Sequence, residues 1–175
     1  MLEKIKRIDS KDFKAVFVKC ERCNRSLLIP VPKKPVLDSK TSELLITYVH
    51  KNYKKKDVHC LLFEVDHDFH IQLPKVADVI FSTHQDAKNK KALVIKDVFI
   101  SCDRCKETIT VPVPENFIRD SKIPKTPIAY IHNNKYGMDQ HCVIPFLDSN
   151  FGDRATRLSD ILIIHIFPYW TKSKK

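Results

Sequence analysis

Short apolar runs rich in β-branched and aromatic residues recur along the first part of this chain, and polar residues or prolines bound each run. This composition is typical of β-strands. It predicts strands over residues 14–19, 26–31, 44–50 and 59–66. The first two runs flank Cys20-Glu-Arg-Cys23, so we expect a hairpin with the cysteine pair at its tip. Residues 33–43 are polar and contain proline, which predicts a loop.

The same pattern returns 82 residues later without a gap. Between residues 14 and 69, 21 of 56 positions are identical to their counterparts, which is far more than chance gives. All six cysteines are kept in this internal repeat. We therefore expect two tandem units, 12–85 and 94–167, joined by a lysine-rich linker over 86–93. Positions kept in both copies are candidates for a shared fold or a shared site.

One segment of each unit leaves the choice between helix and strand open. In residues 74–83 and 156–165 the apolar residues fit helical spacing, but the second segment is also strongly β-branched. The sequence therefore predicts a mostly β fold, or an α+β fold with one short helix in each unit.

Each unit carries two cysteines and two histidines at matching positions. A Cys-x-x-Cys pair at a hairpin tip lets two thiolates converge on one ion, and backbone N–H groups of the turn can donate to the sulfurs. Zn²⁺ takes four nitrogen or sulfur ligands in a tetrahedron, so two more must come from elsewhere in the unit. The third and fourth strands can bring the two histidines together. The predicted ligands of two zinc ions per chain are Cys20, Cys23, His50 and His59, and Cys102, Cys105, His132 and His141.

The cysteine beside the last histidine of each set is an alternative fourth ligand. Adjacent residues of a strand point to opposite faces, so His59 and Cys60 should not both bind one ion. The same holds for His141 and Cys142. We favour the histidines because cysteine is often a small buried hydrophobe. The residues that follow on each face do not decide between the two.

Other uses of the cysteines fit the sequence less well. Disulfides need an oxidising compartment, and three cysteines per unit cannot all pair internally. A redox-active cysteine pair is expected in a βαβ context, which the strand pattern lacks. Residues 16–30, Val-Phe-Val-Lys-Cys-Glu-Arg-Cys-Asn-Arg-Ser-Leu-Leu-Ile-Pro, resemble the first half of a zinc ribbon or a zinc-knuckle-like module. The resemblance implies an all-β module with a structural metal and nucleic-acid or protein contacts. Zinc ribbons usually close with a second cysteine pair, whereas here the closing residues are histidines.

Charge points to one kind of partner. The chain has 31 Lys and Arg against 21 Asp and Glu, a net charge of +10. Such an excess favours contacts with phosphates, which makes nucleic acid one candidate partner beside another protein. The candidate contacts lie in the loop between the two histidines of the first unit: Lys51, Tyr53, Lys54, Lys55 and Lys56. Most of the excess lies outside the two units, so it describes the linker and termini more than the repeated fold.

Other function classes stay open. The tandem units could form a protein-interaction scaffold that accepts strands at its edges near residues 29–32 and 111–114. A zinc hydrolase or nuclease is disfavoured, because a catalytic zinc keeps a coordination position open. Its candidate bases would be Asp66 and Asp148, although an aspartate that ends a strand is more often a turn residue.

The chain also gives an expectation about its location. No apolar run reaches the ~18 residues of a membrane helix. No apolar signal-peptide core follows Met1. We therefore expect a soluble, cytoplasmic protein with no membrane contact, while its oligomeric state is undecided.

Overall fold

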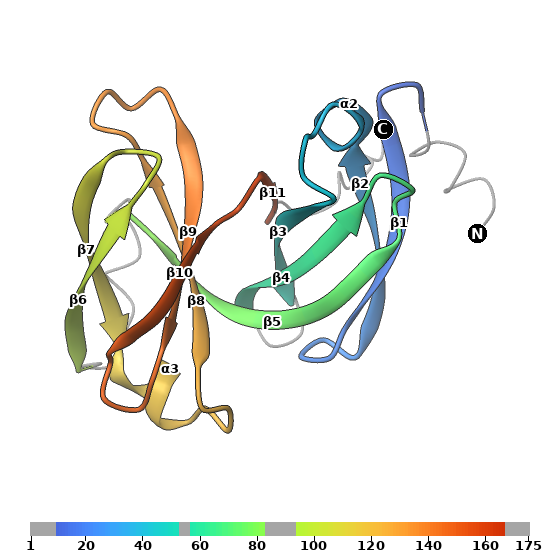
Figure 1. Cartoon of the computed structure of the whole chain (residues 1–175). Coiled ribbons are helices and arrows are strands. Elements are labelled where there is room, and N and C mark those ends of the chain that lie inside the picture. The colour runs from blue at the N-terminus through green and yellow to red at the C-terminus, as the bar shows by residue number, and fades with distance from the viewer. Residues whose placement is uncertain (1–9, 53–56, 83–93, 167–175) are drawn as a thin grey trace, which may run out of the picture.

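The computed structural model describes residues 10–52, 57–82 and 94–166 (Figure 1). Across these residues the fold is mostly β, as the apolar runs predict. The first half contains β1 (Phe13–Cys20), β2 (Arg25–Pro32), α2 (Lys33–Leu37), β3 (Glu43–Asn52), β4 (Asp57–Asp66) and β5 (Ile71–Phe81). The second half contains β6 (Ile95–Cys102), β7 (Glu107–Pro114), α3 (Glu115–Arg119), β8 (Thr126–Asn133), β9 (Gln140–Leu147), β10 (Asp153–Leu158) and β11 (Ile161–His165). No helix in these ranges is long and apolar enough to cross a membrane.

Two cysteine hairpins are present, one in each half, and they are built alike. β1 pairs antiparallel with β2, and β6 pairs antiparallel with β7. In each hairpin alternate side chains of the first strand are buried, as Val16 and Val18 are in the first. The turns end in left-handed residues other than glycine, Asn24 with a φ of 51° and Lys106 with a φ of 58°. The small number of glycines therefore does not prevent these tight turns.

A helix of five residues follows each hairpin, where the segment 33–43 predicts only a loop. That prediction is wrong at its start. Pro32 and Pro114 end the preceding strands in an extended conformation, and the chain turns into the helix directly after them. Each helix buries one apolar side chain, Val36 or Ile118. A single buried side chain has no periodicity, so the sequence pattern could not reveal these helices.

The two segments that the sequence left between helix and strand are strands. Residues 74–81 lie within β5, and residues 156–165 contribute to β10 and β11. Both segments pair with neighbouring strands. β5 pairs with β4 and β8, and β11 pairs with β3. β-Branched side chains pack well on such a pleated surface, and this packing outweighs the helical spacing.

The last strand of each half pairs with a strand of the other half. β5 pairs antiparallel with β4 as far as Asp78 and then runs parallel to β8 over residues 78–81. In turn, β11 runs parallel to β3 over residues 46–50 of the first half. Figure 1 shows both crossings, β5 in green and β11 in dark red. The two halves therefore share one sheet of seven strands, in the order β10-β9-β8-β5-β4-β3-β11.

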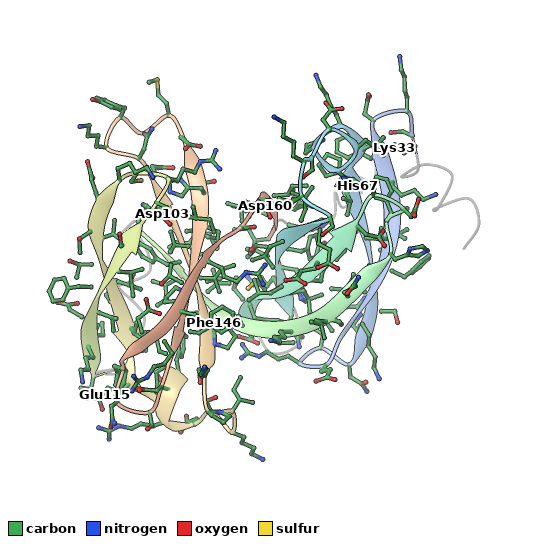
Figure 2. All side chains as sticks on the ribbon, in the orientation of Figure 1. Lys33, His67, Asp103, Glu115, Phe146 and Asp160 are labelled. Carbon is green, nitrogen blue, oxygen red and sulfur yellow. The ribbon has the colours of Figure 1, made fainter. Side chains whose placement is uncertain are left out.

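The two end strands of this sheet are consecutive in the chain, separated only by Ser159 and Asp160. The Ser159 N–H donates to the Cys142 carbonyl in β9 (3.0 Å), and the Asp160 N–H donates to the Leu45 carbonyl in β3 (2.9 Å). The Asp160 carboxylate also accepts from the Leu45 N–H (2.6 Å). Figure 2 shows Asp160 between the two halves of the molecule. This step of two residues joins the two edges of the sheet covalently, and we call the result the closed sheet, although β10 and β11 are not paired with each other.

Three clusters of buried side chains fill the described part of the molecule. The cluster inside the closed sheet draws on both halves, and we call it the central core. Its buried members are Leu45, Val49, Cys60, Leu62, Ala77, Ala129, Ile131, Cys142 and Ile144. The other two clusters lie between a hairpin and the outer face of the sheet, one in each half. Each hairpin thus packs on its own half, whereas the interior of the sheet belongs to both.

Asp66 and Asp148 organise the turns that follow β4 and β9. Asp148 Oδ1 accepts from the N–H groups of Asn150 (2.8 Å) and Gly152 (2.9 Å), and Arg154 Nε donates to Oδ2 (2.6 Å). Asp66 Oδ1 accepts from the equivalent backbone positions in the first half (2.9 and 2.8 Å). The backbone N–H donors are the main cause that lowers the pKa of both carboxyl groups. In the structure both aspartates act as turn residues.

Replacing Asp148 by alanine is expected to lower the melting temperature at neutral pH, because the turn loses two backbone hydrogen bonds. The folded state lowers the pKa of Asp148, so its contribution is present above the ordinary value of 3.8 and is lost as the pH falls through the folded value. The difference from wild type should therefore shrink in acid. Thermal unfolding followed by circular dichroism at several pH values measures this. Asp97→Ala, at an exposed position of β6, is the control. An Asp148→Ala protein as stable as that control would contradict the role of the turn.

Candidate metal centres

Four side chains converge where the first hairpin meets the outer face of the closed sheet. Cys20 ends β1, Cys23 lies in the turn that follows, and His50 and His59 come from β3 and β4. The two histidines are direct cross-strand partners, so their rings share one face with centroids 4.3 Å apart. One donor atom from each of the four residues lies within 4.8 Å of the other three. These are the four residues of this half that the internal repeat singles out in the sequence.

The second half brings the equivalent residues together in the same way. Cys102, Cys105, His132 and His141 also present donor atoms within 4.8 Å of one another. Their histidines are again cross-strand partners, with ring centroids 4.2 Å apart. In both clusters the first cysteine and both histidines are buried, and the second cysteine is partly exposed. The structure thus contains two matching Cys2His2 clusters.

Distances between the donor atoms suit a tetrahedral ion. Zinc–sulfur bonds of about 2.3 Å and zinc–nitrogen bonds of about 2.05 Å place sulfur and nitrogen about 3.6 Å apart in a tetrahedron. His59 Nε2 lies 3.3 Å from the sulfurs of both Cys20 and Cys23, and His50 Nδ1 lies 3.9 Å from the Cys23 sulfur. The distances from the equivalent Nε2 atom in the second half are 3.2 and 3.4 Å. These values bracket the separation that the ion requires.

Burial leaves histidine nitrogens without other partners. Nε2 of His50 and of His132 is buried and meets no hydrogen-bond partner among the described residues. A buried polar atom without a partner is costly, and an ion bound through Nδ1, the His50 nitrogen that lies near the Cys23 sulfur, would not give Nε2 a partner. The sulfur of the first cysteine already accepts a backbone N–H, from Cys23 at 3.4 Å in one cluster and from Cys105 at 3.5 Å in the other. The fit to a metal ion therefore rests on the donor types and on their separations.

The protein environment shifts the pKa values of these donors toward their neutral forms. Burial first, and the neighbouring His59 second, lower the pKa of His50 to about 4. Burial also lowers the pKa values of His59 and His132, so these rings are neutral at pH 7 and can offer a lone pair. Burial raises the pKa values of Cys23 and Cys105 to about 11. A metal-bound thiol is deprotonated outright, so metal binding would release protons from the cysteines.

An aspartate and an arginine support the first cluster from outside. Asp57 Oδ2 lies 3.0 Å from His59 Nδ1. Arg22, inside the cysteine turn, lies 3.8 Å from the same carboxylate oxygen and 2.7 Å from Asp78 Oδ1. Such partners of a ligating histidine fix its ring orientation and raise its basicity.

In the second cluster an aspartate and an arginine also lie beside the histidine, but the histidine ring contacts the backbone oxygen of the aspartate. His141 Nδ1 lies 3.1 Å from the backbone oxygen of Asp139 and 3.6 Å from its carboxylate. Arg104 donates two hydrogen bonds to that carboxylate, at 2.7 and 2.8 Å. Sequence reasoning gives the aspartates and arginines no role. The available signal is their identity in both copies, at the same offset from the ligands.

Replacing Asp57 by alanine is expected to weaken metal binding at the first cluster by about 10- to 100-fold, because His59 loses the group that orients its ring. The matched variant Asp139→Ala should have a smaller effect, because the His141 ring keeps the backbone oxygen as its partner. Competition with a coloured chelator measures both affinities. Equal affinities in Asp57→Ala and wild type would argue against a supporting role for this carboxylate.

Cys60 and Cys142 lie away from the two clusters. They follow His59 and His141 in their strands, so they point to the opposite face and join the central core. Both are fully buried, and burial raises the pKa of the Cys142 thiol to about 12 and that of Cys60 well above its ordinary range. Within the described residues, neither thiol belongs to a group of metal donors.

Most of the proposed nucleic-acid contacts fall outside the described residues. Lys51 is described, and it is half-buried in β3 opposite Val58. Tyr53, Lys54, Lys55 and Lys56 are outside, and so is the lysine-rich linker 86–93.

Each cluster could hold one metal ion, which gives two per chain. All four donors in a cluster come from protein side chains, so an ion with four ligands has no open position for a substrate. No protein-family model, curated protein or solved structure matches this chain.

Proposed function

We propose that this chain is a non-catalytic zinc protein in which two structural ions fix the cysteine hairpins to the closed sheet. The observation that carries this proposal is the pair of matching Cys2His2 clusters. Two thiolates and two imidazoles suit Zn²⁺, whereas Mg²⁺ and Ca²⁺ prefer oxygen ligands. Cys20, Cys23, His50 and His59 would hold one ion, and the equivalent residues of the second half would hold the other.

The ions would act by joining elements that are distant in sequence. The two sulfurs belong to the tip of a hairpin, and the two nitrogens belong to neighbouring strands of the closed sheet. Each hairpin is a sheet of only two strands, and such a hairpin is marginally stable in isolation. Four bonds to one ion would fasten its tip to the sheet, while the apolar cluster beneath it holds the rest.

Elemental analysis of protein purified without chelator tests the metal directly. We expect two zinc ions per chain. Protein without metal, or protein fully loaded with a metal other than zinc, would contradict the proposal.

For the partner, we propose nucleic acid as the class that best suits a chain with a net charge of +10. Titration of a mixed-sequence oligonucleotide at about 50 and 200 mM salt tests this. We expect affinity at the lower salt and a steep fall at the higher salt. A lack of affinity at low salt would contradict a nucleic-acid partner.

A specific feature of the second hairpin favours a protein partner as a second candidate. Ile95 and Phe99 are 57% and 71% exposed on its outer face. Exposed apolar side chains next to acidic groups suit contact with another protein better than contact with phosphates. A partner recovered after nuclease treatment, and lost on Phe99→Ala, would support this candidate.

A further inference from the structure

The outer face of each hairpin, which points away from the closed sheet, carries large apolar side chains. In the first hairpin Phe13 and Phe17 are 42% and 47% exposed. They occupy the same face of β1 with Ala15 between them. Leu28 and Pro30, their neighbours on β2, are partly buried and extend this apolar surface. Ile95 and Phe99 occupy the equivalent positions of the second hairpin.

The two hairpins differ in net charge. Residues 13–34 hold six basic side chains and one acidic side chain, a net charge of +5. The equivalent residues 95–116 hold three basic and four acidic side chains, a net charge of −1. Figure 2 shows one such pair of equivalent positions, Lys33 and Glu115, at opposite ends of the molecule. The two hairpins share one backbone pattern but offer different surfaces to a charged ligand.

The contrast is sharpest beside the exposed phenylalanines. Lys19 lies on the same face as Phe17, two residues further along β1. Arg25 begins β2 at the same end of the hairpin, opposite Cys20, and so belongs to the other face. Both are exposed, and neither makes an ion pair within the described residues. The second hairpin has other residues at these positions, a serine in place of Lys19 and a glutamate in place of Arg25.

Proteins that bind single-stranded nucleic acid combine exposed aromatic rings, on which bases stack, with cations that contact the phosphates. Base stacking needs an unpaired strand, because the faces of paired bases are covered within a duplex. The first hairpin offers both parts on one face, with Phe13 and Phe17 as rings and Lys19 as the cation. The second hairpin offers a ring without this cation.

We infer that the outer face of the first hairpin is a binding surface for single-stranded nucleic acid, and that the equivalent face of the second hairpin is not. This inference rests on the proposed nucleic-acid partner and names its surface and strandedness. Bases would stack on Phe17 and Phe13, and a phosphate would contact Lys19. The first zinc site lies at the tip of this hairpin and would hold the surface in place.

Fluorescence anisotropy of a labelled single strand of about 16 nucleotides, the upper end of known site sizes, tests the inference on the full-length, zinc-loaded protein. Phe17→Ala should weaken binding about tenfold, the effect of losing one stacked base. Phe99→Ala, its match in the second hairpin, should leave affinity within about twofold of wild type, since no base stacks there. Lys19→Ser, which installs the residue of the second hairpin, should reduce the slope of log affinity against log salt by about one. Each variant should retain two zinc ions, because all three side chains point away from the cluster of their own hairpin.

The outcomes separate the inference from the proposed function beneath it. If wild-type protein binds no oligonucleotide, both fail. If wild-type protein binds but Phe17→Ala and Phe99→Ala have equal effects, the surface is wrong while the nucleic-acid partner stands. Tighter binding to a duplex of the same sequence, or displacement by polyglutamate as effective as by unlabelled strand, would contradict recognition by stacking. The second result would point to an acidic protein partner.

Discussion

Cys20→Ser is expected to reduce the zinc content from two ions per chain to one and to destabilise the protein severely. A structural zinc site contributes about 10–16 kcal/mol of apparent binding free energy in small zinc-binding peptides at neutral pH. A typical domain has a total free energy of unfolding of only about 5–15 kcal/mol. Loss of one ion should therefore detach the first hairpin or unfold the chain. Elemental analysis together with thermal unfolding measures both effects, and Cys102→Ser should match it in the second half.

Cys60→Ala is the control for this experiment. Cys60 lies in the central core and not in the cluster, so this variant should keep two zinc ions and lose only packing. Retention of both ions and wild-type stability in Cys20→Ser would contradict a structural role for the first cluster. Loss of an ion in Cys60→Ala would instead identify Cys60 as a ligand.

Ile144→Ala is expected to lower the free energy of unfolding by about 2–5 kcal/mol, the usual cost of such a cavity. Ile144 is completely buried in the central core, which both halves line. Because the cavity opens in a shared core, the destabilisation should reach both halves and both clusters together. Urea unfolding followed by circular dichroism, with zinc release followed by a coloured chelator, should show one transition for all signals.

Leu62→Ala is the matched variant, since Leu62 occupies the equivalent position of the first half and is 4% exposed. It should produce a similar loss and the same single transition. Two separate transitions, with each variant affecting only the zinc site of its own half, would show that the halves are independent.

Local patterns in the sequence were sufficient for the strands and for the four members of each cluster. A hairpin turn places its two cysteines side by side, and cross-strand pairing places His50 opposite His59. The internal repeat adds a second instance of the same spacing, which separates these residues from the histidines that occur once. Strand alternation also separates His59 from Cys60, once the structure shows which face the hairpin covers.

The exchange of strands could not be predicted in the same way. Alternation along β5 and β11 shows that they are strands but carries no information about which strand they pair with. The chain leaves one neighbour for another at Asp78 and Asp160, and no alternation marks those two positions. The supporting contact between Asp57 and His59 was missed for a similar reason, because its geometry appears only when the strands are placed in register.

The strand exchange has a consequence for how the stability of this protein should depend on its concentration. β5 pairs with β8 and β11 pairs with β3 in the same relation, to within one residue of register. This is the pattern of an isologous interface, in which two copies of one subunit each give the other the same element. Two separate subunits would dissociate on dilution, and their melting temperature would depend on concentration. Here one chain carries both copies, so their association is intramolecular and its effective concentration is fixed by covalent linkage. The melting temperature of the chain should therefore stay constant on dilution, even though its interior is built like that of a dimer.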